Sequence, residues 1–90
     1  MTKAFRTVTI ANRRGLHARA SAKFVTLAAT QNVEITVIKD GPPVTGTSIM
    51  GLMMLGAAMG DCITISAEGA GADDAVAALA ALVEDKFGED

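Results

Sequence analysis

The 90-residue chain contains very few aromatic residues, and only one histidine and one cysteine. It has three Phe and no Tyr or Trp, which argues against the aromatic stacking that single-stranded nucleic-acid binding usually requires. The net charge of −2 also argues against strong binding to a phosphate backbone. We therefore expect no nucleic-acid partner.

Other absences restrict the cellular compartment in which we expect the protein and the kinds of site that it can hold. The single cysteine, Cys62, cannot form an internal disulfide, which fits a reducing compartment. No apolar run is long enough to span a membrane, and none follows the first basic residues as in a signal peptide. The sequence shows no Cys-x-x-Cys pair, carboxylate cluster or P-loop. We expect a cytoplasmic protein without membrane insertion, metal ion or cofactor.

The hydrophobic residues make up 50% of the chain, enough for one modest core, so we expect a single domain over residues 1–90. The C-terminal third is mostly acidic, whereas the basic residues gather in the N-terminal part. These basic residues include Lys3, Arg6, Arg13, Arg14, Arg19 and Lys23. A local basic patch near His17 is therefore expected inside an acidic protein.

The hydrophobic pattern predicts strands and helices in alternation. Strand-like runs predict four strands, over residues 4–10, 33–37, 44–45 and 62–66. Apolar residues at helical spacing predict three helices, over residues 18–30, about 49–55, and from near Asp73 to just before Gly88. Strands with one apolar face suit an antiparallel sheet that is covered on one side. We predict an α/β (α+β) open-faced sandwich of order βαββαβα, a four-stranded antiparallel sheet with three helices on one face.

His17 lies where a predicted turn becomes a helix. Gly15 permits the turn, and the start of the helix offers unpaired N–H groups and a positive dipole end that suit a phosphate. Arg19 adds a planar guanidinium that matches phosphate oxygens. A neutral imidazole nitrogen can attack phosphorus and form a labile bond. A lone histidine is more often structural, but these features favour a phosphoryl acceptor.

Two other functions are alternatives to that of a phosphoryl carrier. A hydrolytic enzyme requires a base and an orienting carboxylate beside its nucleophile, and the local sequence offers neither. A small-molecule-binding regulatory domain of ferredoxin-like topology has a similar order of elements, and the fold alone does not exclude it. Such a domain has no need of His17 and Arg19 at a helix start, so these two residues favour the carrier.

Three motifs occur in order along the chain: Gly15-Leu16-His17-Ala18-Arg19, Ser48-Ile49-Met50-Gly51, and the segment from Ile63 to Gly69. In sequence, order and separation they resemble the HPr family, the histidine-containing phosphocarriers of the bacterial phosphoenolpyruvate-dependent phosphotransferase system. The resemblance covers nearly the whole chain and implies an open-faced sandwich that acts as a stoichiometric carrier, not as an enzyme. It also implies that His17 accepts a phosphoryl group from enzyme I and passes it to IIA proteins, assisted by Arg19.

One position departs from the family pattern. HPr proteins usually have proline directly after the arginine, where this chain has Ala20. Alanine is also tolerated in the first turn of a helix, so the helix should still form. The change bears on how rigidly His17 is presented and on which partners the protein prefers. Both sugar uptake and a nitrogen-related phosphotransfer chain remain open.

The second motif suggests regulation and docking. Ser48 is a natural N-cap, and the resemblance implies that a dedicated kinase/phosphorylase modifies it. The following helix is too short to bury all its apolar residues, and flexible methionines suit a surface that fits several partners. The resemblance therefore assigns Ile49, Met50 and Met53 to a docking face, to which we add two residues beside His17. These two are Leu16 and Ala20. We expect the protein to be a monomer.

Overall fold

The computed structural model describes residues 3–89. The strands are β1 (Lys3–Thr9), β2 (Ile35–Ile38), β3 (Val44–Thr45) and β4 (Cys62–Glu68). The α-helices are α1 (Ala18–Ala29), α2 (Ile49–Met54) and α3 (Ala72–Glu84), followed by the short 3-10 helix η1 (Lys86–Gly88). The predicted order of strands and helices is confirmed.

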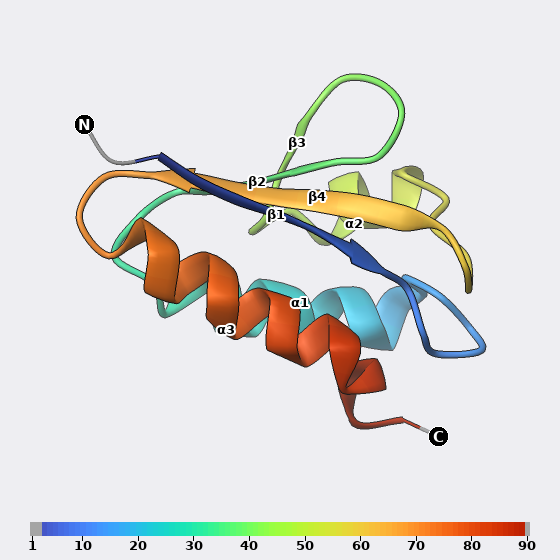
Figure 1. The fold of residues 1–90 in the computed structure, drawn as a ribbon. Helices are drawn as coiled ribbons and strands as arrows, with labels where there is room; N and C mark the ends of the chain where they lie inside the picture. The colour runs from blue at the N-terminus through green and yellow to red at the C-terminus, as the bar shows by residue number, and fades with distance from the viewer. Residues whose placement is uncertain (1–2, 90) are drawn as a thin grey trace.

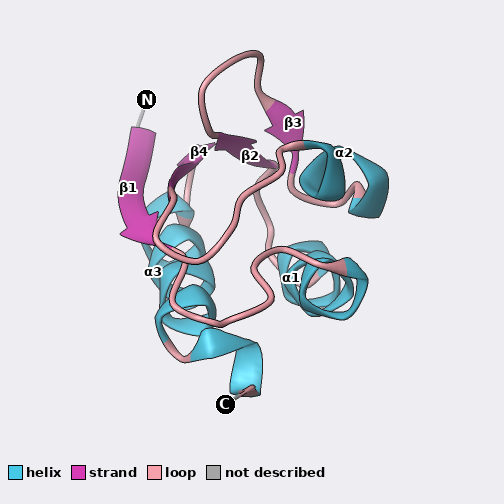
Figure 2. Cartoon of the chain, turned by 90° about the vertical axis from the view of Figure 1, so that its right-hand side faces the viewer, coloured by secondary structure: helices cyan, strands magenta, loops and turns pink. Residues whose placement is uncertain are grey.

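The four strands form one sheet in the order β1-β4-β2-β3, and every neighbouring pair is antiparallel. Helices α1 and α3 run beneath the sheet (Figure 1), and α2 lies beside β3 at the edge of the sheet (Figure 2). The predicted open-faced sandwich is therefore confirmed. Its strand order brings the first strand next to the last one, with Lys3 opposite Glu68 and Thr9 opposite Cys62.

The core lies between the sheet and the two long helices. Alternate residues of each strand point toward the helices, including Val8 on β1, Val37 on β2 and Ile65 on β4, and all three are buried. Phe24 of α1 and Leu79 of α3 are fully buried against them. The opposite face of the sheet carries mainly polar side chains, such as the hydrogen-bonded hydroxyls of Thr7 and Thr64, together with the exposed Phe5. Alternation with period two therefore produces one covered face and one open face.

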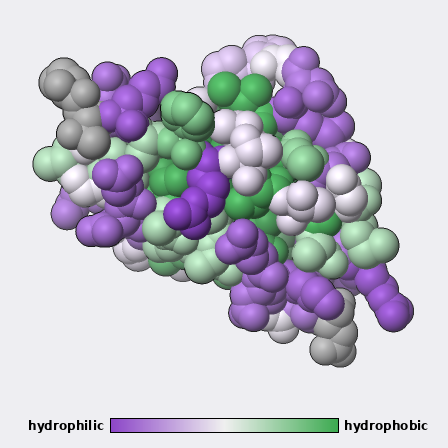
Figure 3. All heavy atoms as spheres, in the orientation of Figure 1, coloured by the Kyte–Doolittle hydropathy of each residue, from purple (hydrophilic) through white to green (hydrophobic). Residues whose placement is uncertain are grey.

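The hydropathy of the surface varies over the face of the molecule on which β1 and α3 lie. Apolar residues gather over the middle of this face and hydrophilic residues over both ends (Figure 3). Within the described part of the chain, no helix is both long and apolar enough to cross a membrane.

The boundaries differ most from the prediction at the C-terminal end. Helix α3 ends at Glu84, and the chain then turns through Lys86 and Phe87, whose φ angles are 59° and 56°. Phe87 is fully buried because this turn directs its ring back into the core. We call residues 85–89 the C-terminal hook. An apolar residue beyond a helix end is the sequence feature that indicates such a return, and the prediction did not use it.

Candidate functional site

The loop before His17 is packed against the loop that precedes β4. The N–H of Ile10 donates to the carbonyl of Asp61 at 2.8 Å, and the N–H of Leu16 donates to the carbonyl of Ala57 at 3.0 Å. Gly15 has a φ of +65°, and a Cβ atom at this position would lie 2.4 Å from the Ala57 oxygen. Only glycine fits there, so the turn predicted at Gly15 is required by both conformation and close approach.

Leu16 and Ala20 were predicted to belong to the docking face, and this was wrong for both residues. Leu16 is 5% exposed and Ala20 is 0% exposed. Leu16 anchors the loop in the core, and its carbonyl accepts a hydrogen bond from the Ser21 hydroxyl at 3.2 Å. Ala20 lies on the buried side of α1, and Phe24, one turn further along the helix, lies on the same side. Neither side chain is therefore available to a partner.

His17 is the N-cap of α1, with an extended backbone (φ −75°, ψ −179°). Its Nδ1 accepts a hydrogen bond from the backbone N–H of Arg19 at 3.3 Å. Its Nε2 lies 2.5 Å from Oε2 of Glu89, and the imidazole side chain is 17% exposed. An ionised carboxylate only accepts hydrogen bonds, so Nε2 must carry the hydrogen. In the neutral ring the free lone pair is therefore on Nδ1, which faces the helix N-terminus.

Glu89 is a site residue that the sequence analysis missed. It belongs to the C-terminal hook, 72 residues after His17, and its other oxygen accepts a hydrogen bond from Asn12 Nδ2 at 3.0 Å. Burial alone would raise the pKa of Glu89, but the hydrogen bonds from Asn12 and His17 and the electrostatic attraction of His17 and Arg14 outweigh burial. The pKa of Glu89 therefore lies below its ordinary value of 4.5. The carboxylate is thus ionised at neutral pH and available to orient the ring.

The C-terminal hook is fastened to α1 by Lys23. Its Nζ donates to the carbonyl of Phe87 at 2.7 Å, while the Phe87 ring is buried in the core. These two contacts fix the backbone directly before Gly88 and thereby help to bring Glu89 to His17 at the start of α1. The acidic residues at the end of the chain are the only sequence feature that could have suggested a carboxylate partner for His17.

Arg19 follows the phosphoacceptor candidate on the exposed side of α1. Within residues 3–89 its guanidinium takes part in no ion pair. It lies at a shallow groove of about 490 Å³ that runs along α1 toward α3. The other residues lining this groove are Ala22, Lys23, Thr26, Leu27, Thr30 and Leu82. The structure therefore leaves Arg19 accessible.

Ser48 caps α2 as expected, since its Oγ accepts a hydrogen bond from the N–H of Gly51 at 3.0 Å. The remaining surface of α2 is strongly apolar. Met50 is 69% exposed, and Ile49 and Met53 are about 40% exposed, whereas Leu52 is fully buried. Met54, which the sequence analysis did not single out, is 80% exposed. We call Ile49, Met50, Met53 and Met54 the α2 patch.

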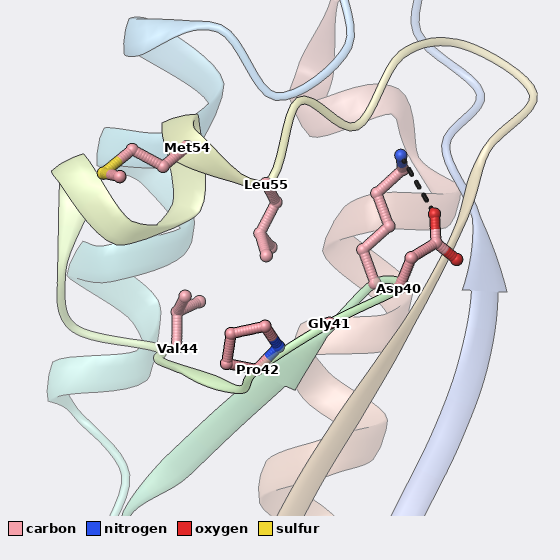
Figure 4. A pocket seen from close by; sticks show the side chains of 7 residues that line it. Asp40, Gly41, Pro42, Val44, Met54 and Leu55 are labelled. Atoms are coloured by element: carbon pink, nitrogen blue, oxygen red, sulfur yellow. Dashed lines mark ion pairs between the residues drawn. The ribbon is translucent and has the colours of Figure 1, made fainter.

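The α2 patch adjoins a hollow of about 380 Å³ between α2 and the turn that connects β2 to β3. The side chains of Met54, Leu55, Val44 and Pro42 surround it, and Asp40 lies at its rim (Figure 4). Asp40 pairs with Lys39, whose Nζ is 3.4 Å from the carboxylate. The apolar surface of α2 is thus continuous with an apolar depression that has charged residues at one side.

The described residues contain no group of three or more His, Cys, Asp and Glu side chains that could hold a metal ion. The site brings together the His17 imidazole, a carboxylate on one side of its ring and a helix N-terminus on the other. Arg14 contributes positive charge beside Glu89, and the exposed Arg19 follows two residues after His17. This arrangement can accept a phosphoryl group on Nδ1 and release it again.

Comparison with known proteins identifies the family of this chain. Residues 5–85 match the family model described as the PTS HPr component phosphorylation site. The chain is 45% identical to phosphocarrier protein NPr of Shewanella violacea over 99% of this chain and 98% of that protein. It is 43% identical to phosphocarrier protein HPr of Cupriavidus necator over 93% of this chain and 94% of that protein.

A solved structure of HPr from Thermoanaerobacter tengcongensis superposes with a TM-score of 0.88 at 43% identity, covering 100% of this chain and 99% of that one. These matches decide between the phosphocarrier and the ligand-binding regulatory domain in favour of the phosphocarrier. They extend over the sheet, the three helices and the loop that presents His17. The chain therefore belongs to the HPr family and is a phosphoryl carrier of the phosphotransferase system.

Proposed function

We propose that His17 is the residue that carries the phosphoryl group and that Nδ1 is the atom to which it is attached. The observation that supports this proposal is the pair of contacts on the ring: Glu89 engages Nε2, while Nδ1 faces the N–H of Arg19. In the transfer step a bond forms between Nδ1 and phosphorus, and the bond between phosphorus and the donor breaks. The hydrogen on Nε2 stays in place, held by Glu89.

The start of α1 stabilises the group after transfer. The phosphoryl oxygens take the place of Nδ1 as acceptors for the N–H of Arg19, at the positive end of the helix dipole. The accessible guanidinium of Arg19 adds a permanent positive charge. Because the carboxylate of Glu89 lies on the opposite edge of the ring, it supports the positive charge that the imidazole gains while its own charge stays away from the phosphoryl group.

The donor in this proposal is enzyme I and the acceptors are IIA proteins, and the proposal covers sugar uptake and the nitrogen-related chain alike. The α2 patch is their docking surface, because it is apolar and exposed. Within this proposal the chain acts as a cytoplasmic monomeric carrier without catalytic turnover of its own. A second modification is phosphorylation of Ser48 by a kinase/phosphorylase, which would place charge at the edge of that patch.

Intact-mass measurement after incubation with phosphoenolpyruvate and enzyme I tests the proposal. The wild-type chain should gain one phosphoryl group that is lost in acid, since a phosphorus–nitrogen bond to histidine is acid-labile. His17→Ala should gain none while its circular dichroism spectrum and melting temperature stay near wild type. Arg19→Lys keeps the charge but not the planar fork, and it should label more slowly. Acid-labile labelling of His17→Ala would overturn the proposal.

A further inference from the structure

Asn12 is the one fully buried side chain close to the site that carries a polar amide. It is 0% exposed and lies in the loop between β1 and α1. Its Nδ2 donates two hydrogen bonds, one to the carbonyl of Gly15 at 2.8 Å and one to Oε1 of Glu89 at 3.0 Å. Both partners are acceptors, so the amide nitrogen, not its oxygen, must face them.

The amide oxygen of Asn12 shows that this orientation has a cost. Among the described residues Oδ1 is buried and accepts no hydrogen bond. A buried polar atom without a partner is destabilising, so stability alone gives little reason for an asparagine at this position. The two donated hydrogen bonds are what the amide supplies, and one of them reaches the carboxylate that contacts His17.

Glu89 has contacts on both carboxylate oxygens, with Asn12 on Oε1 and His17 on Oε2. The hook fixes the backbone near Glu89 through Phe87 and Lys23, but a glutamate side chain retains three rotatable bonds beyond its backbone. The hydrogen bond from Asn12 removes that freedom and directs the second oxygen at Nε2. The same amide holds the carbonyl of Gly15, two residues before His17 in the chain.

We propose that Asn12 is a positioning residue that ties Glu89 to the loop presenting His17 and thereby keeps the hydrogen on Nε2 and the lone pair on Nδ1. This inference rests on the proposed role of His17 as phosphoacceptor. Asn12 acts on the reaction only through Glu89 and touches neither the ring nor the phosphoryl group. In metal sites, the groups that hydrogen-bond to a ligating histidine likewise orient its ring without taking part in the reaction themselves.

The test measures the ring tautomer and the transfer rate separately. The nitrogen chemical shifts of neutral His17 should show mainly the form with hydrogen on Nε2 in the wild type. In Asn12→Ala the fraction with hydrogen on Nδ1 should rise, and phosphorylation by enzyme I should slow by about 10-fold, as on loss of other histidine-orienting partners. If Asn12→Ala does not fold, Asn12→Ser replaces it, because the shorter side chain cannot span from the loop to Glu89.

The background of Glu89→Gln distinguishes positioning from a structural role. If Asn12 acts through Glu89, removing Asn12 from the Glu89→Gln chain should slow transfer no further. The inference is overturned if the slowing caused by each substitution alone multiplies in the double variant. It is also overturned if the tautomer is unchanged in Asn12→Ala. The tautomer is read without any transfer, so it remains informative if the wild-type chain does not accept an acid-labile group at His17, which is the result that would overturn the proposed function.

Discussion

The ring of His17 is restrained at both of its nitrogens, and each restraint has a different physical origin. The N–H of Arg19 belongs to the first turn of α1 and points at Nδ1 because helix geometry leaves it without a partner inside the helix. The carboxylate of Glu89 comes from a distant part of the sequence, and packing of the hook brings it to Nε2. Together they fix the orientation of the nucleophile before a donor arrives, which reduces the entropy lost in the transfer step.

The hydrogen bonds of the Glu89 carboxylate predict how the free energy of unfolding depends on pH. The folded-state pKa of Glu89 is lowered from 4.5, so its contribution to the free energy of unfolding is present above 4.5 and lost as the pH falls through the lowered value. The wild type should therefore be more stable than Glu89→Gln at pH 6, and the difference should shrink in more acidic solution. Urea denaturation of both proteins at several pH values checks this. A difference that grows toward acidic pH would contradict it.

Ser48 allows a second prediction at this scale. Its Oγ already caps α2, and negative charge at a helix N-terminus is favourable, so Ser48→Asp should keep the melting temperature level or raise it slightly. The same charge would lie beside the apolar α2 patch and oppose docking of enzyme I. The rate of His17 labelling should therefore fall. Equal rates in Ser48→Asp and wild type would leave Ser48 as a helix cap only.

At the scale of elements, α2 owes its conformation to its neighbours. A six-residue helix is not stable in isolation, so it depends on the Ser48 cap and on the buried side chain of Leu52. Gly51 lets it approach β3, because a Cβ atom there would lie 3.2 Å from Cβ of Val44. One side of α2 is thus fixed against the fold, and its methionines remain exposed on the other.

Charge placed on that exposed side should affect docking more than folding. Met50→Glu is expected to weaken binding to enzyme I at least 10-fold, since a charged group would lose its hydration in the interface. The melting temperature should change little because Met50 is 69% exposed. Isothermal titration and thermal unfolding measure the two effects. Leu52→Glu is the matched control on the buried side of the same helix, and it should unfold the protein.

In the C-terminal hook, a favourable free energy of burial is opposed by backbone strain. Burial of the Phe87 ring contributes about 1.5–3 kcal/mol. Two non-glycine residues with positive φ, Lys86 and Phe87, each cost about 1–3 kcal/mol. Together the two strained residues cost about 2–6 kcal/mol, which burial of the ring offsets only in part. The hydrogen bonds of Lys23 and Glu89 therefore also hold the hook.

Relieving that strain should tighten the hook. Lys86 is exposed and has a φ of 59°, so Lys86→Gly is expected to stabilise the protein by about 0.5–1 kcal/mol, after the greater flexibility of unfolded glycine is deducted. Denaturant unfolding measures this change. Glu84→Gly, in the last turn of α3, is the control and should be destabilising. A loss of stability in Lys86→Gly would show that the side chain of Lys86 matters more than its backbone.

The whole molecule has a net charge of −2, yet the surroundings of His17 are basic. The exposed cations there are Arg13, Arg14, Arg19 and Lys23. Such a local patch attracts a phosphorylated donor over a distance of about one Debye length, which falls from about 30 Å at 0.01 M salt to about 8 Å at 0.15 M.

The rate of phosphorylation by enzyme I should therefore decrease as salt is added at a fixed low protein concentration. Arg14→Gln should flatten this dependence, whereas Arg6→Gln makes the same change of charge on β1 and should leave the slope near wild type. Stopped-flow or rapid-quench labelling over a salt series gives the slopes. Equal slopes for all three proteins would mean that the local patch does not steer the donor.

Much of this molecule could be predicted from local sequence. The turn at Gly15, the start of the helix after His17 and the alternation in β4 depend on residues within a few positions of one another, so hydrophobic period and turn residues were sufficient. Leu16 and Ala20 were misplaced because the direction of a side chain at a helix start depends on what packs beneath it. Glu89 and Asn12 were missed because their contacts join positions as far as 77 residues apart, and no local pattern encodes such a pairing.

The position of Glu89 also has a consequence for how the protein is made. Synthesis proceeds from the N-terminus, so Glu89 is added after every strand and α-helix of the fold. His17, which is made early, therefore obtains its carboxylate partner only after the rest of the fold has been synthesised. A chain that stops before Glu89 keeps Phe87 and the core but lacks this partner, so it should fold yet exchange phosphoryl groups slowly.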